Sequence, residues 1–160
     1  MEFTSITEYF YKISSRLLLI LLIPIFFFIY VYLQPVRVPD YPSQNPDTLH
    51  VVAVIMVLVW IAGFIFFNKK IKSIRKGQGL REKLEKYSRL TIVRYIFFSL
   101  CSLFLAIGFL LTRNDVFALV FILQLVVAGV VWPFSPKVSN DLKLRGAERE
   151  MVYYRKDTLS

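Results

Sequence analysis

The chain has very few residues of the kinds that support metal or redox chemistry. Among its 160 residues there is one cysteine, Cys101, and one histidine, His50. A single cysteine excludes an intrachain disulfide and a site built from several thiolates. One histidine cannot supply the two imidazoles of a bis-histidine haem. We therefore expect no cofactor and no metal ion.

The sequence also lacks the common signatures of catalysis. It contains no GxGxxG or Walker loop, no HExxH and no GxSxG, which are the patterns that position phosphates, zinc or a nucleophilic serine. An enzyme acting on lipid phosphates would have to use Arg94, Arg89 and His50, and it would lack an obvious nucleophile. The chain is therefore predicted not to be an enzyme.

Four stretches lack charged residues altogether: 17–33, 51–67, 95–111 and 116–132. Each has 17 residues, which is about 25 Å as a helix and near the lower limit for crossing a bilayer core of about 30 Å. They do not show the alternation of barrel strands, and lipid-exposed spans are either helices or closed barrels. With 56% hydrophobic residues, the sequence predicts an all-α integral membrane protein with four transmembrane helices.

What the chain has in excess is positive charge, concentrated in one segment. Residues 68–89 hold nine of the twenty Lys and Arg, opposed by Glu82 and Glu85, so the segment carries +7 of the formal net charge of +9. Because this charge borders apolar stretches, we exclude nucleic acid and expect an anionic lipid surface as the partner. Basic loops beside spans resist translocation, so the segment is predicted to be cytoplasmic.

The same rule orients the whole chain. With Arg94 left aside at a span border, 17 basic residues fall on the predicted inner side and two, Arg37 and Arg113, on the outer side. This predicts an up-down bundle with both termini cytoplasmic (N-in/C-in), in the plasma (inner) membrane. We assign 1–134 to a four-helix transmembrane domain with a basic cytoplasmic hairpin at 68–89, and 135–160 to a cytoplasmic amphipathic tail.

Apolar residues with helical spacing continue beyond the uncharged stretches, which predicts that the second and third helices project into the cytoplasm and pack on each other there. These residues are Ile71 and Ile74 before a glycine-rich break at 77–79, and Leu80, Leu84 and Tyr87 after it. The short turn at 112–115 makes the third and fourth helices antiparallel neighbours. In the tail, Ser135 and Ser139 are candidate caps of two short amphipathic helices on the membrane surface.

The polar residues inside the spans are few, and Ser99, Ser102 and Gln124 lie near the middle of the predicted membrane. We interpret them as intramembrane polar packing. Gln124 would bond a serine hydroxyl or the Ile20 carbonyl that Pro24 frees. A polar substrate site is the alternative.

Several basic residues are candidates for contact with lipid or a partner; the alternative is that they serve topology alone. They are Lys69, Lys70, Lys72, Arg75, Lys76, Arg89 and Arg94. Arg94 is interpreted as an interfacial side chain that snorkels to the headgroups, and a phosphate site shared with Arg89 and Lys69 is its functional alternative.

Small residues at similar depth suggest a close approach of the second and fourth helices. Ala62-Gly63 and Ala128-Gly129 would allow it, either within one bundle or between protomers.

The leading functional hypothesis is a non-enzymatic accessory or scaffold subunit that packs against other membrane proteins and anionic lipid. The alternative is a small homo-oligomeric transporter or channel. That alternative is weakened because the four uncharged stretches contain no Asp, Glu or Lys, whereas proton-coupled carriers normally use an intramembrane carboxylate.

Overall fold

The computed structural model describes residues 3–34, 46–75 and 79–156, and between 46 and 57 it describes the side chains of Val54 and Ile55 alone. The described residues form helices and no strand, as predicted. The helices are α1 (Ile6–Leu33), α2 (Pro46–Ile74), α3 (Leu80–Thr112), α4 (Asp115–Val130), α5 (Ser135–Leu142) and α6 (Gly146–Tyr154). The uncharged stretch 17–33 lies within α1.

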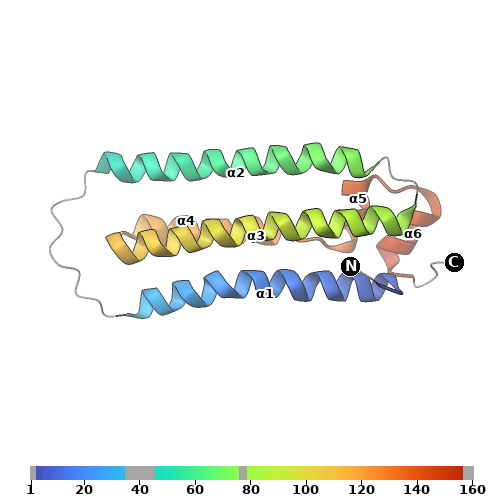
Figure 1. Cartoon of the computed structure of the whole chain (residues 1–160), viewed down its shortest axis with the longest axis horizontal. Helices are drawn as coiled ribbons and strands as arrows, with labels where there is room; N and C mark the ends of the chain where they lie inside the picture. The colour runs from blue at the N-terminus through green and yellow to red at the C-terminus, as the bar shows by residue number, and fades with distance from the viewer. Residues whose placement is uncertain (1–2, 35–45, 76–78, 157–160) are drawn as a thin grey trace.

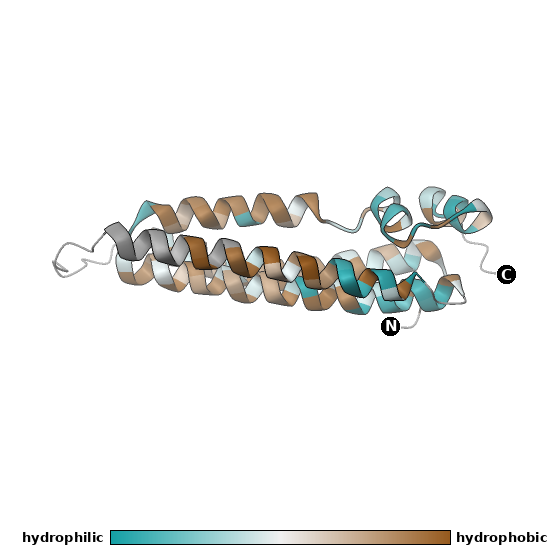
Figure 2. Ribbon diagram, turned by 90° about the horizontal axis from the view of Figure 1, so that it is seen from above, coloured by the Kyte–Doolittle hydropathy of each residue, from teal (hydrophilic) through white to brown (hydrophobic). Residues whose placement is uncertain are grey.

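Helices α1 to α4 run side by side along the long axis, and α5, α6 and both ends of the chain lie together at one end (Figure 1). Figure 2 shows that apolar residues dominate the long helices and that hydrophilic residues gather at the end with α5 and α6. Within the described residues, α1 and α3 are long and apolar enough to cross a membrane. A third span results if α4 and α5, bent by 75°, count as one.

The polar end of the bundle has its own hydrophobic core. The stripes predicted for the hairpin are buried and belong to one cluster with residues from the N-terminal half of α1. Their members are Ile71 and Ile74 of α2 and Leu80, Leu84 and Tyr87 of α3. The apolar stripes of α2 and α3 therefore join in one core, as the helical spacing predicted.

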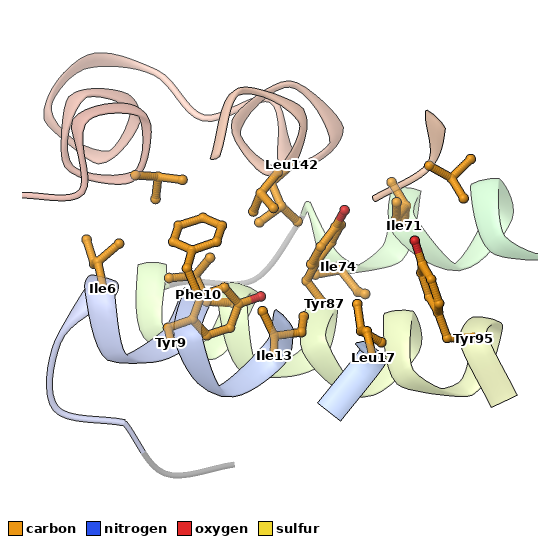
Figure 3. Packing of buried hydrophobic residues seen from close by; sticks show 14 of the residues in the cluster. Ile6, Tyr9, Phe10, Ile13, Leu17, Ile71, Ile74, Tyr87, Tyr95 and Leu142 are labelled. Carbon is orange, nitrogen blue, oxygen red and sulfur yellow. The ribbon is translucent and has the colours of Figure 1, made fainter. Parts of the chain in front are cut away.

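Apolar residues of the tail helices cover this core. Val138, Leu142 and Val152 are fully or almost fully buried in the same cluster, and Figure 3 shows Leu142 pointing from α5 toward the buried side chains of α1, α2 and α3. The predicted caps are wrong, because Phe134 and Arg145 occupy the N-cap positions of α5 and α6.

Polar bonds hold the tail on the hairpin. Asp141 of α5 accepts a hydrogen bond at its carboxylate from the Tyr87 hydroxyl (2.9 Å) and at its backbone carbonyl from Arg75 Nε (2.7 Å). Lys83 of α3 pairs with Glu148 of α6 at 3.0 Å. Burial, reinforced by the Asp141 carboxylate, raises the pKa of the Tyr87 phenol, so this hydroxyl remains a neutral donor.

The opposite end is held by aromatic packing and a tight turn. Phe28 of α1 stacks on Phe121 of α4 with ring centroids 4.1 Å apart. Asn114 caps α4, since its Oδ1 accepts from the Val116 amide at 2.9 Å. The short turn makes α3 and α4 packed neighbours, as predicted.

The close approach between α3 and α4 depends on Gly108. A Cβ at this position would lie 2.5 Å from the Phe117 ring, which no real side chain tolerates without a shift. The small residue that lets α3 and α4 meet is therefore Gly108, which was not among the small residues predicted to allow a close helix contact.

Candidate functional site

Three side chains bind the last carbonyls of α4. The Tyr95 hydroxyl donates to the Ala128 carbonyl (2.7 Å), Arg94 Nη2 to the Val131 carbonyl (2.7 Å) and Lys137 Nζ to the Val130 carbonyl (2.9 Å). Terminal carbonyls have no partner inside their own helix, and cations are favourable at this negative end of the helix dipole. This contact fixes the end of α4 beside α3.

Arg94 is turned into the bundle, where 9% of its surface is exposed. Its guanidinium carbon lies 3.9 Å from the centre of the Phe67 ring of α2. The interpretation of Arg94 as a snorkelling side chain is wrong, because it bonds a helix end and an aromatic face inside the protein. Arg113 acts similarly at the other end, donating to the Val31 and Gln34 carbonyls at the end of α1.

An apolar groove of about 710 Å³ lies between α2 and α4, with α3 as its floor. Its walls are Val59–Phe64, Phe66 and Phe67 of α2, Leu90, Val93, Arg94, Phe97 and Phe98 of α3, and Val127, Val130 and Val131 of α4 and its end. The volume is in the range of about 300–1,000 Å³ that is usual for ligand sites.

This groove corrects the predicted contact between α2 and α4 within one bundle. Ala62 is exposed, and a Cβ at Gly63 would meet Phe97 of α3 at 3.3 Å. A Cβ at Gly129 would find no described atom within 4 Å. The two pairs of small residues are therefore not in contact within one molecule, because α2 packs on α3 and the groove separates it from α4.

A second cavity, of about 340 Å³, carries positive charge and lies between α2 and α3. It is lined by Lys70, Ser73, Lys86 and Arg89 together with Phe66, Ile74, Leu90 and Val93. Phe66, Leu90 and Val93 also line the apolar groove. The apolar groove and the basic cavity are therefore adjacent.

The basic residues predicted to contact lipid or a partner do not all lie at one site. Lys70 and Arg89 share the basic cavity with Lys86, which was not predicted. Lys69 and Lys72 are exposed on α2 without lining it, while Arg75 bonds the tail and Arg94 lies in the groove. Lys76 lies outside the described residues. Lys86 precedes Arg89 by about one helical turn. This spacing could have predicted that Lys86 and Arg89 lie on the same face of α3.

Two of these basic side chains already have acidic neighbours on α3. Lys86 pairs with Glu82 at 2.6 Å and Arg89 with Glu85 at 2.8 Å, both at i,i+4 spacing. The Arg89 side chain is 73% exposed in its pair. Salt bridges between exposed side chains are weak.

Gln124 lies inside the bundle, with 1% of its surface exposed. Its Nε2 donates to the Phe98 carbonyl of α3 at 2.6 Å. The predicted partners, a serine or the Ile20 carbonyl, are wrong, because the amide bonds the Phe98 carbonyl instead. A carbonyl that already accepts a bond within its helix keeps a second lone pair, which a side-chain amide can use. Ser99 and Ser102 are also buried. Gln124 Oε1 and Ser102 Oγ have no bonding partner among the described residues.

Comparison with known proteins gives no relative: no protein-family model, curated protein or solved structure matches this chain. Among the described residues no group of three or more His, Cys, Asp or Glu could hold a metal ion.

Proposed function

We propose that the chain is a four-span, non-enzymatic accessory or scaffold subunit of the plasma (inner) membrane that packs against other membrane proteins and anionic lipid. In this proposal the polar end, with α5, α6 and both termini, is cytoplasmic. The asymmetry of 17 inner and two outer basic residues supports that orientation. The gathering of hydrophilic residues at one end of the bundle agrees with it.

The observation that carries the proposal is the incomplete packing of α2. This helix packs chiefly on α3, with α5 at its polar end. Its outward side exposes Val54, Leu58, Ile61 and Ile65, which follow helical spacing. A helix that is apolar on all sides suits a membrane span or a buried position, so α2 can accept a further apolar helix on this side.

The cavities favour binding over chemistry. Ser73 is the one hydroxyl among the residues that line the basic cavity, and that lining contains no carboxylate or imidazole to act as its base. A transporter would need a polar path at Gln124, and neither cavity is lined by that residue. We therefore favour the accessory role over the transporter.

Affinity purification from native membranes in mild detergent, followed by mass spectrometry, tests the accessory role. We expect a distinct membrane protein to co-purify with the wild-type chain. The double variant Leu58→Trp/Ile65→Trp, which reshapes the outward face of α2, should lose that protein. Leu119→Trp/Ile122→Trp alters exposed residues of α4 and is the matched control.

The accessory role is refuted if the wild-type chain purifies by itself, as a monomer or as a homo-oligomer. Equal loss of the co-purifying protein from both double variants would refute the assignment of the docking face to α2.

A further inference from the structure

We infer that the cleft beside α2 binds one anionic phospholipid of the cytoplasmic leaflet, with an acyl chain in the apolar groove and the phosphate at Lys70, Lys86 and Arg89. This inference rests on the proposed membrane orientation. It names the lipid partner of the chain and the place where that lipid is held.

The shape of the cleft supports this occupant. The groove and the basic cavity meet at Phe66, Leu90 and Val93, which line both. The apolar and the charged space therefore lie side by side, on residues of the same two helices. A phospholipid has this division between chain and headgroup, whereas a partner's transmembrane helix would need an acidic end at the same place.

The dimensions match one leaflet. The α2 wall of the groove extends from Val59 to Phe67, which is about 12 Å along a helix. Half of a bilayer core is about 15 Å thick. Ser73, in the basic cavity, lies about 9 Å further along the helix. The apolar part of the cleft thus covers most of one leaflet, and the basic part reaches the headgroup level.

The charge of the basic cavity selects an anionic headgroup. Lys70, Lys86 and Arg89 supply donors, and Ser73 adds a hydroxyl. The carboxylates of Glu82 and Glu85 hold Lys86 and Arg89 through exposed pairs, and the oxygens of one lipid phosphate can accept from several of these donors at once. The cavity lining contains no carboxylate to hold a choline cation.

Native mass spectrometry of the full chain with defined lipids tests the inference. The probes are phosphatidylglycerol and phosphatidylcholine with identical acyl chains. We expect the wild-type chain to retain one phosphatidylglycerol in preference to phosphatidylcholine. The variant Lys70→Gln/Lys86→Gln/Arg89→Gln should bind phosphatidylglycerol about tenfold more weakly or worse.

The matched control removes the same charge outside the cavity. Lys69→Gln/Lys72→Gln/Arg149→Gln replaces exposed basic residues that do not line the cleft, and it should retain the lipid. Equal loss in both triple variants would show a diffuse electrostatic attraction and would overturn the site.

A second variant blocks the junction without changing charge. Val93 is 57% exposed and lines both cavities, so Val93→Trp should abolish lipid retention while the melting temperature stays near that of the wild type. Ile96→Trp, on the same helix at a 45% exposed residue that lines neither cavity, should retain the lipid. Equal retention in both variants would overturn the inference.

The test also separates this inference from the proposed function. A photoreactive residue at position 93 that cross-links to a protein instead of a lipid would make a partner helix the occupant, which overturns the lipid site and leaves the accessory role. Equal binding of the two lipids by a chain that still co-purifies with its partner would likewise overturn the anionic-lipid site and leave the accessory role.

Discussion

Replacing Arg94 by methionine should destabilise the bundle, because this side chain joins three helices. The guanidinium donates to the Val131 carbonyl at the end of α4 and lies on the Phe67 ring of α2. A hydrogen bond from a charged donor contributes about 1.5–3 kcal/mol, and a cation–π contact about 0.5–2 kcal/mol. Methionine also removes the cost of burying a charge. We expect a net loss of about 2 kcal/mol in the free energy of unfolding.

The single thiol of the chain provides the assay. Cys101 is free and 6% exposed, so a thiol-reactive dye in detergent should label it when the bundle unfolds. A loss of about 2 kcal/mol corresponds to a melting temperature about 4–8 °C lower. Arg94→Lys should fall between wild type and Arg94→Met, because lysine keeps a donor but loses the planar stacking.

Arg89→Met is the control, since the Arg89 side chain is 73% exposed and pairs with Glu85 on its own helix. It should change the free energy of unfolding by no more than about 0.5 kcal/mol. If Arg94→Met melts at the same temperature as Arg89→Met, the contact of Arg94 with α4 does not hold the bundle together.

Three further variants test other contacts. Gly108→Ala should lower the melting temperature because its Cβ would meet the Phe117 ring at 2.5 Å, and Phe117→Leu should partly restore it; no rescue would contradict the close approach. Gln124→Leu should cost less than about 1 kcal/mol in the same assay, since interhelical hydrogen bonds in membranes average about 0.6 kcal/mol; a larger loss would mean that the amide is essential to packing. Asp141→Ala removes the carboxylate bonded by Tyr87, so limited proteolysis should cleave the tail faster than in the wild-type chain; an unchanged rate would mean that apolar contacts alone hold α5.

The helices and the hairpin core could be predicted because their signals are local. Uninterrupted apolar residues predicted α1, and the spacing of Ile71, Ile74, Leu80 and Leu84 identified residues that are buried in one cluster. The short turn fixed α3 and α4 as neighbours. In each case the helical period determined which residues face the core, or the length of the turn determined which helices are neighbours.

The candidate site could not be predicted, because it depends on how α2, α3 and α4 pack against one another. Arg94 turns inward since the last carbonyls of α4 happen to lie beside it, and its position at a span border predicts the opposite. The groove exists because Gly63 faces Phe97 and not α4. Lys86 becomes part of a basic cavity only when α2 stands opposite α3.

The central claim is that this chain spans the membrane four times with its polar end inside, and labelling by an impermeant maleimide in intact cells tests it most directly. Single cysteines are placed at Gly77, Pro42 and Asp115 in a Cys101→Ser background. The account predicts labelling at position 42, in the first outer connection, and at position 115, at the start of α4 beside the second outer connection. Position 77 should be labelled only after the cells are opened. Labelling at position 77 in intact cells, or at only one of positions 42 and 115, would contradict it.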